Sequence, residues 1–298
     1  MKISIITVTK NNKAGLLRAI ECVRRQSYKN VEHIIVDGGS VDGSAEILRD
    51  AQNDSLLSTQ YSLLTISEAD SGIYDAINKG IKLATGDVIG LLHSDDLYAD
   101  ENVLSRYAEI FLNQKTDAVY SDLVYVSQKS EVRSQESEGG NSTTINYLLL
   151  TTNYSVIRYW KTHKSMISNQ SSVKSENTDN RLLVTNHLLN KGWMPPHPTL
   201  FIRKEIFEKY GFYNTDLKIA SDYEMILRLL YKHQITSYYL PLTTYLMSIG
   251  GASNKSIGNI IQKSKEDFRA MKMNGLKFPV LTLISKNLRK LPQFLARA

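Results

Sequence analysis

Several acidic residues of this chain stand where its apolar runs end, and their chemistry is the first feature to consider. Asp37 directly follows the apolar run 31–36 and precedes Gly38. A carboxylate at that place can accept hydrogen bonds from a ribose or from a base N–H group. It can equally be a turn-forming Asp before two glycines. Position alone leaves both roles open.

A second acidic pair, Asp95-Asp96, follows the apolar run 87–92 and the dipeptide His93-Ser94. Adjacent like charges are unfavourable unless a cation or solvent relieves them. In an extended segment alternate residues share a side, so His93 and Asp95 would face one site and Asp96 would face away. One carboxylate that shares Mg²⁺ or Mn²⁺ with substrate phosphates fits this pattern. The alternative is that Ser94, Asp95 and Asp96 cap the next helix.

A third candidate, Asp222, lies in the segment Ser221-Asp222-Tyr223-Glu224. Ser221 and Glu224 have the spacing of a capping box, which predicts the start of a helix. Asp222 is then either a partner of the helix dipole in the first turn or a general base. His197 stands between two prolines and can be a ligand, an acceptor contact or a packed polar residue.

The elements that must position these residues alternate regularly over the first 125 residues. We expect strands over residues 2–9, 31–36, 61–67 and 87–92, a further strand that opens at 118–120, and helices over 13–26, 44–51, 73–84 and 102–112. This alternation implies an α/β fold with a mostly parallel sheet that is covered on both faces. Ligands of such sheets bind beyond the carboxyl ends of the strands. The polar residues after the first, second and fourth strands are therefore candidates by position.

The rest of the chain is less regular. We expect strands over residues 156–161 and 199–202 and a helix over 220–231. Polar stretches near 127–150 and 165–185 are read as surface inserts, which can be solvated loops or a lid.

The composition is that of a soluble globular protein. The chain has 298 residues, of which 42% are hydrophobic and 22% charged, which indicates one large domain, or one domain plus a tail. The single cysteine rules out an intramolecular disulfide framework and a Cys-based zinc site. We find no apolar run long enough to cross a membrane and no secretory signal, so we expect a cytoplasmic protein.

Three common motifs are missing from the sequence. A G-x-G-x-x-G after the first strand, a G-x-x-x-x-G-K-[ST] and a G-x-S-x-G are all absent. A dinucleotide-binding Rossmann site, a P-loop and an α/β-hydrolase nucleophile elbow are therefore disfavoured.

The C-terminal segment has a different charge from the rest. Residues 255–298 carry ten Lys or Arg against two acids, whereas the whole chain carries a net charge of +6. A basic tail on a near-neutral body indicates an anionic partner, either nucleic acid or a membrane surface. Its apolar and basic residues interleave as in a helix that lies in a lipid interface. The alternative is a helix packed on the body or on a second subunit. Few aromatic residues in the tail argue against nucleic acid.

Taken together, the ordered motifs resemble those of the family 2 glycosyltransferases, which have the GT-A fold. The blocks that carry the resemblance are ISIITVTKN (3–11), VDGGSVDG (36–43), SEADSGIYDAINKG (67–80), HSDD (93–96), HPTLF (197–201) and ASDY (220–223). Their order and spacing match over about residues 2–230, and the chain looks most similar to bacterial enzymes of exopolysaccharide, capsule and O-antigen assembly.

The resemblance implies a role for each matching residue. A GT-A domain would span residues 1–250, with a nucleotide-binding half to about 125 and an acceptor half from 126, followed by a basic helical tail over 251–298. The implied nucleotide-sugar contacts are Thr7, Thr9, Asn11, Asp37, Asp70, Gly72, Lys79 and His93. Asp95 would bind Mn²⁺ or Mg²⁺, Asp222 would be the catalytic base, and His197 is a candidate acceptor contact.

The chain departs from the family pattern at three positions. His93 stands where the D-x-D motif has its first acid, Ser221 stands where many relatives have Glu, and Ile77 stands where many have Arg.

The implied activity is an inverting, metal-dependent hexosyl transfer from a nucleotide diphosphate sugar to a hydroxyl of a lipid-linked saccharide. Such an enzyme would act at the inner face of the cytoplasmic membrane, with the tail on the anionic surface. The sequence leaves open whether the protein forms a homo-oligomer. One alternative is a non-catalytic assembly protein with the same fold, which His93 keeps open. The other is a sugar-nucleotide pyrophosphorylase, but its Gly-rich loop would stand where the sequence has TKNN (9–12).

Overall fold

The structure is a computed structural model that describes residues 1–52, 61–128, 154–160, 187–248 and 257–288. Nearly all of the two inserts predicted near 127–150 and 165–185 lies outside the described residues.

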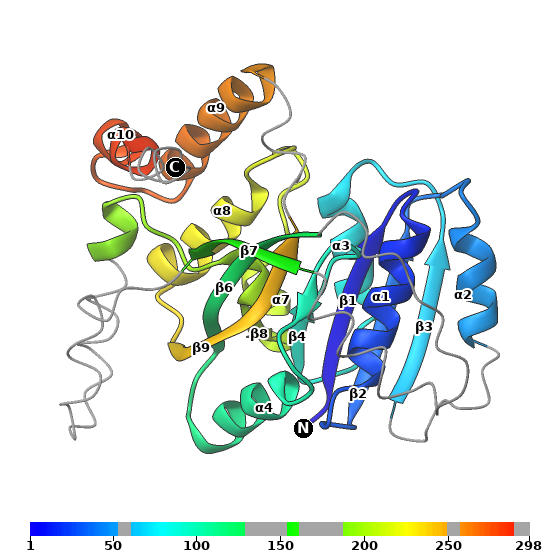
Figure 1. Cartoon of the computed structure of the whole chain (residues 1–298). Coiled ribbons are helices and arrows are strands. Elements are labelled where there is room, and N and C mark those ends of the chain that lie inside the picture. Colours follow the sequence, from blue (N-terminus) through cyan, green and yellow to red (C-terminus); the bar gives the residue numbers. More distant parts are fainter. Residues whose placement is uncertain (53–60, 129–153, 161–186, 249–256, 289–298) are drawn as a thin grey trace.

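The N-terminal half of the sheet is parallel, as predicted. Its strands are β1 (Ile3–Thr9), β2 (Val31–Asp37), β3 (Tyr61–Ser67) and β4 (Val88–Leu91), in the spatial order β3-β2-β1-β4. Each neighbouring pair is parallel, so the carboxyl ends of these strands lie along one edge of the sheet (Figure 1).

The second half of the sheet mixes directions. β8 (Phe201–Arg203) pairs antiparallel with β4 and with β6 (Ala118–Gln128), and β9 (Ser237–Ser248) runs parallel to β6. The short β5 (Leu97–Tyr98) and β7 (Tyr154–Trp160) pair antiparallel with β9 and β6. The strand predicted to open at 118–120 does begin at Ala118, and it extends to Gln128, where β9 and β7 pair with its C-terminal part.

Helices cover both faces of the sheet. The side chains of β1, which point alternately to the two faces, show this directly. Ile6 and Val8 enter one apolar cluster, while Ile3 and Ile5 enter the other. The first cluster includes side chains from α3 (Ile73–Leu83) and α8 (Ser221–Ile226), and the second includes side chains from α1 (Lys13–Arg24) and α4 (Val103–Asn113). Burial on both faces explains why the strands read as continuous apolar runs. The helices α2 (Ser44–Gln52) and α7 (Lys204–Tyr210) complete the body.

The helix predicted over 220–231 is present, but the predicted capping box is wrong. Ala220 is the N-cap residue of α8 and makes no side-chain cap, and the chain continues as a π-helix over Leu227–Lys232. The Glu224 carboxylate does not reach back to the N-terminus. It pairs with Arg228 at 3.1 Å, one helical turn on, because both side chains are buried together.

The basic C-terminal segment folds onto the body. α9 (Ile257–Met273) packs against α8, and α10 (Pro279–Leu288) packs against α9 (Figure 1). A buried ion pair joins α10 to α9, with Lys286 Nζ 2.8 Å from Asp267 Oδ1. The same ammonium group lies over the Tyr223 ring of α8. Within the described part of the chain, no helix combines the length and apolar character that a bilayer crossing requires.

Gly90 of β4 offers a test of how closely the sheet packs. A Cβ atom at this position would lie 2.3 Å from the buried Phe201 ring. We predict that Gly90→Ala lowers the free energy of unfolding by about 1–3 kcal/mol, measured by urea denaturation, because overpacking displaces the ring. In a Phe201→Leu background the same substitution should cost clearly less. An equal cost in both backgrounds would contradict the close-approach explanation.

Candidate functional site

The predicted site residues gather where β1, β2 and β4 end. The Gly38 N–H donates to the Thr9 carbonyl at 2.9 Å, and the Glu68 N–H donates to the Asp37 carbonyl at 3.0 Å. The loops that follow β1, β2 and β3 are thus joined by backbone hydrogen bonds. This is the edge of the sheet that the strand–helix alternation predicted.

Two of the predicted contacts, Thr7 and Asp37, are buried anchors beneath this edge. The Thr7 hydroxyl donates to the Leu92 carbonyl at 2.6 Å and bonds His33 Nε2 at 2.8 Å. The Asp37 carboxylate accepts hydrogen bonds from the Ser40 hydroxyl and N–H, and from the Ser67 hydroxyl at 2.6 Å. Both side chains therefore fix the ends of the strands.

Thr9 and Asn11 lie higher on the same edge. The Thr9 hydroxyl is buried and has no hydrogen-bond partner among the described residues, which leaves it available to a ligand. Asn11 adopts a left-handed backbone with φ 51°. Its N–H donates to the Ser40 hydroxyl at 2.7 Å, and its side-chain oxygen accepts from the Val41 N–H at 2.9 Å. Asn11 thus holds the loop that follows β2 in place.

The segment 68–79 brings a second acid to this edge. Asp70 accepts a hydrogen bond from the Gly72 N–H at 3.0 Å, and its carboxylate lies against Gly38, where a Cβ would come within 2.3 Å of it. Lys79 pairs with Glu68 at 2.8 Å and donates to the Ala69 carbonyl at 3.0 Å. The hydrogen bond that Lys79 donates to the Glu68 carboxylate raises the pKa of the Lys79 ammonium. Lys79 therefore supports the loop that carries Asp70.

The segment His93–Asp96 is a turn, so the extended backbone predicted for it is wrong. The Asp96 N–H donates to the His93 carbonyl at 3.0 Å, because the chain must reverse between β4 and β5. Asp95 is exposed and accepts a hydrogen bond from the Asn12 amide at 2.6 Å. Asp96 is buried, and burial together with the Asp95 charge raises the pKa of its carboxyl to about 7. The two acids thus have different environments.

His93 differs from the acid that it replaces in both charge and partners. Its Nδ1 atom is buried and has no hydrogen-bond partner among the residues that the structure describes. Burial, and to a smaller extent the nearby His197, lowers the pKa of the imidazole to about 4. His93 is therefore neutral at pH 7 and lies close enough to His197 for their charges to interact.

Asp222 lies in the first turn of α8 beside two tyrosines. The Tyr74 hydroxyl donates to the Ile219 carbonyl at 2.9 Å and lies 3.4 Å from Asp222 Oδ1. The Tyr74 ring stacks on that of Tyr213, with centroids 5.7 Å apart, and the Tyr213 hydroxyl bonds His197 Nε2 at 2.8 Å. Burial lowers the pKa of His197, whereas the Asp222 charge raises it. These electrostatic interactions connect Asp222 to His197, and His197 to His93.

Sequence reasoning gave no role to Tyr74 or Tyr213. Tyr74 lies inside the motif 67–80, but nothing in the sequence pairs it with Asp222. Asn78 holds the Tyr213 backbone through two hydrogen bonds, at 2.8 and 2.9 Å, and so brings the segment before α8 against α3. Only this tertiary contact reveals the pair of tyrosines.

The acid side chains fit a divalent cation only in part. Among the described residues, no group of three or more His, Cys, Asp or Glu side chains could hold a metal ion. Asp95 nevertheless offers an exposed carboxylate, and Mg²⁺ is commonly held by one or two carboxylates together with substrate phosphates. The residues therefore fit a cation that arrives with a diphosphate.

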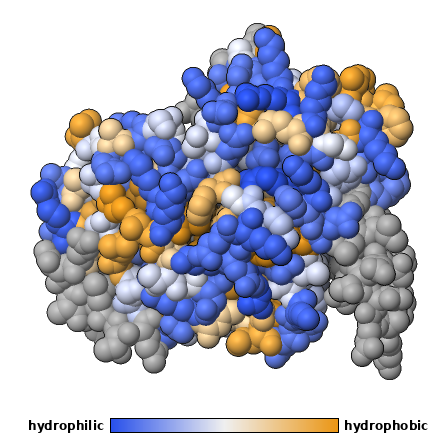
Figure 2. Space-filling view, turned by 180° about the vertical axis from the view of Figure 1, so that it is seen from behind, coloured by the Kyte–Doolittle hydropathy of each residue, from blue (hydrophilic) through white to orange (hydrophobic). Residues whose placement is uncertain are grey.

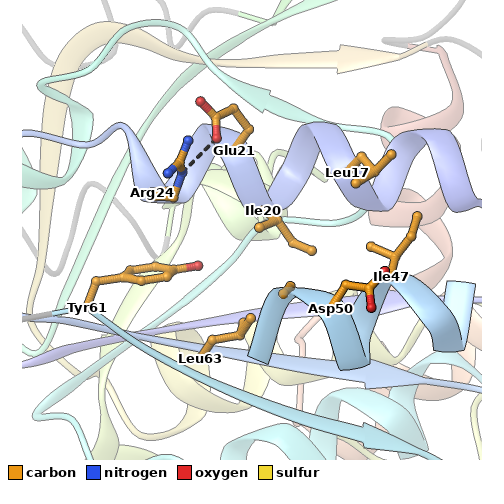
Figure 3. Close-up of a pocket in the computed structure, with 9 residues that line it drawn as sticks. Leu17, Ile20, Glu21, Arg24, Ile47, Asp50, Tyr61 and Leu63 are labelled. Carbon is orange, nitrogen blue, oxygen red and sulfur yellow. Dashed lines mark hydrogen bonds and ion pairs between the residues drawn. The ribbon is translucent and has the colours of Figure 1, made fainter. Parts of the chain in front are cut away.

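An apolar pocket elsewhere is separate from these residues. It lies between α1, α2 and β3 and is lined by Leu17, Ile20, Ile47, Tyr61 and Leu63, among others (Figure 3). None of its lining residues belongs to the predicted site.

Comparison with known proteins decides the family. The model of the family described as "Glycosyl transferase family 2" matches residues 4–211. The chain belongs to this family.

Relatives in the family are similar over different lengths. An uncharacterized glycosyltransferase of Mycobacterium tuberculosis is 36% identical over 108 residues, which are 36% of this chain and only 38% of that relative. A PGL/p-HBAD biosynthesis glycosyltransferase of Mycobacterium bovis is 24% identical over 300 residues, covering 99% of this chain and 93% of the relative.

Solved structures show the same GT-A architecture. S. aureus TarS 1-349 in complex with UDP aligns with a TM-score of 0.58 and 14% identity, over 98% of this chain and 72% of that one. A mannosyltransferase of Pyrobaculum calidifontis, in complex with GDP-Man and Mn²⁺, aligns with a TM-score of 0.58 and 15% identity, over 99% and 73%. The predicted fold class is confirmed. The family match ends at residue 211, so Asp222 and α9 lie outside it.

Proposed function

We propose that this family 2 glycosyltransferase transfers a hexose from a nucleotide diphosphate sugar to an acceptor hydroxyl with inversion. The observation that carries the proposal is the place of Asp222. Its carboxylate is partly exposed in the first turn of α8, beside Tyr74 and coupled electrostatically to His197. The similar structures contain UDP in one case and GDP-Man in another, which supports a nucleotide sugar as the donor.

A single displacement accounts for inversion. The acceptor oxygen forms a bond to the anomeric carbon as the bond from that carbon to the diphosphate oxygen breaks. The acceptor proton passes to the Asp222 carboxylate. This O–H bond is the only new bond that the protein itself makes. We assign His197 to the acceptor side, because its ring is coupled to Asp222 and held by Tyr213.

On the donor side, the residues divide into contacts and supports. Thr9 and His93 have buried polar atoms that lack a partner within the described residues, so we assign them to direct contact with the nucleotide sugar. Asn11, Asp70 and Gly72 would line the same edge of the sheet. We assign supporting roles to the buried Thr7 and Asp37 and to the ion-paired Lys79.

A divalent cation completes the donor site in this proposal. Mn²⁺ or Mg²⁺, when bound, neutralises charge on the departing diphosphate. Asp95 would hold it, and the neighbour that contains Mn²⁺ supports this choice. Asp95 already accepts a hydrogen bond from Asn12, which orients the carboxylate.

The acceptor that we propose is a lipid-linked saccharide in bacterial surface polysaccharide synthesis, reached from the membrane surface. Exposed apolar side chains lie just before and along α10, namely Phe278, Val280, Leu281, Ile284 and Leu288, each at least half exposed. Figure 2 shows this apolar surface over α10, at the upper right of the view. The exposed Lys277 directly precedes these residues, and the exposed Lys272 lies in the last turn of α9. An apolar row with basic neighbours is typical of a helix that lies in an anionic lipid interface.

The structure limits which tail residues can take part in docking. Lys286, one of the basic residues of the tail, is buried in its ion pair with Asp267 and does not face outwards. Residues 289–298 lie outside the described chain. The docking surface proposed for α10 is therefore mainly apolar.

Asp222→Asn tests the catalytic assignment. We predict that this substitution lowers kcat by about 10²–10⁴-fold, the usual contribution of a positioned base, and leaves nucleotide affinity unchanged. Release of nucleotide from the donor sugar, followed in the presence of acceptor, measures it. The matched control is Asp216→Asn, whose side chain is 75% exposed in the same segment. If the wild type turns over and the Asp222→Asn variant is equally active, Asp222 is not the base. If the wild type itself shows no turnover, the non-catalytic alternative is favoured.

Asp95→Ala tests the cation site. We expect the substitution to abolish the gain in nucleotide diphosphate affinity that Mn²⁺ gives to the wild type, because the only exposed carboxylate of the turn is lost. Calorimetric titration with and without EDTA measures both affinities. An undiminished effect of Mn²⁺ in the variant would contradict the assignment.

Replacing Leu281 and Ile284 by Ser tests the membrane surface. These side chains are 65% and 50% exposed on α10. We predict that binding to phosphatidylglycerol vesicles weakens about tenfold or more, since each apolar side chain inserted contributes roughly 1.5–3 kcal/mol when fully buried. Leu112→Ser on α4, at a side chain that is 64% exposed, is the control. Vesicle sedimentation unchanged by the double substitution would exclude α10 as the docking surface.

A further inference from the structure

A buried carboxylate from α9 holds the segment that precedes Asp222. Glu266 is buried and accepts hydrogen bonds from three consecutive N–H groups, those of Lys218, Ile219 and Ala220, at 3.2, 2.7 and 3.0 Å. The Gln262 amide donates to the same carboxylate at 2.8 Å. Burial favours the neutral acid, but these hydrogen bonds lower the pKa of Glu266, so it is a carboxylate at neutral pH.

This contact differs from an ordinary helix cap in the N–H groups that it binds. The first N–H groups of a helix have no partner within the helix, and a nearby side chain normally accepts from them. α8 has no such side-chain cap of its own, because Ala220 is the N-cap residue. Glu266 instead accepts, from a distant helix, the three N–H groups that lead up to and include the N-cap residue, and so fixes the backbone two residues before Asp222.

The same segment is held from its other side by Tyr74. The Ile219 N–H donates to Glu266, whereas the Ile219 carbonyl accepts from the Tyr74 hydroxyl at 2.9 Å. That hydroxyl is also 3.4 Å from the Asp222 carboxylate. The peptide at 219 thus lies between α9 and α3, and its position sets the distance between Tyr74 and Asp222.

We propose that Glu266 is a positioning residue for Asp222, acting through the backbone of residues 218–220. The proposal rests on the proposed role of Asp222 as the base. Misplacement of a reacting group by 1 Å can cost about 10²-fold in rate. Because the Glu266 carboxylate accepts from three N–H groups, it restricts such movement. Glu266 lies on α9, which the family match does not reach.

The first experiment measures amide hydrogen exchange in the full chain, without any ligand. Glu266→Gln removes the charge and turns one accepting oxygen into a donating NH₂ group. We expect exchange at 218–220 to accelerate about tenfold or more. Glu208→Gln, which removes an exposed carboxylate from α7, should leave these amides unchanged. If Glu266→Gln does not fold, Gln262→Ala loosens Glu266 more gently and should accelerate the same amides to a smaller extent.

The second experiment reads the position of Asp222 through His197. The Asp222 charge raises the pKa of this imidazole, so Asp222→Asn should lower the pKa that NMR titration of His197 reports. Glu266→Gln should lower it in the same direction, because Asp222 moves. In the Asp222→Asn background, Glu266→Gln should then add no shift.

Two results would overturn the proposal: unchanged exchange at 218–220 in a folded variant, or an equal shift of the His197 pKa in both backgrounds. The second result would mean that Glu266 acts by its own charge. Neither measurement needs turnover, so their outcome is distinct from that of the Asp222→Asn activity assay.

Discussion

Parallel pairing of β1, β2 and β4 is the constraint on which the site depends. Because the strands run in the same direction, the polar residues that follow them meet at one edge of the sheet. The faces cannot hold these residues, since helices bury both of them against apolar clusters. The chemistry of the chain is therefore confined to the loops after the strands and to the helix that reaches them from the second half of the molecule.

Several buried or part-buried charges of the body are satisfied by hydrogen bonds or by ion pairs. Asp37 accepts from Ser40 and Ser67, Glu224 pairs with Arg228, and Lys286 pairs with Asp267. Removing one partner from such a group typically costs several kcal/mol, because an uncompensated charge stays buried. Other contacts join segments that are distant in sequence: the N–H groups of residues 218–220 donate to Glu266 of α9, and the Asn274 amide donates to Glu224 of α8. These hydrogen bonds hold a C-terminal segment outside the family match against the start of α8.

The sequence predicted the first half of the fold well, because the signals for its strands, helices and turns are local. Apolar runs and helical spacing located β1 to β4 and the helices between them, and the glycines marked the turns. The capping box predicted at Ser221 and the extended backbone predicted at His93–Asp96 were both wrong. Glu224 pairs with Arg228 one turn further along the helix and accepts a hydrogen bond from the Asn274 amide, and the chain turns at His93–Asp96 to enter β5. The partners of Asp222, namely Tyr74 and the segment held by Glu266, have no sequence signal, since they arise from packing between α3, α8 and α9.

Nucleotide binding tests the central claim most directly, namely that the edge formed by β1, β2 and β4 is a nucleotide-sugar site. Thermal unfolding would be followed with UDP, GDP and dTDP, each in the presence of Mn²⁺, Mg²⁺ or EDTA. We expect one nucleotide to stabilise the protein only with metal, by roughly 2.7 kcal/mol at a hundred times its dissociation constant. The absence of stabilisation by every nucleotide in the presence of both metals would contradict the account.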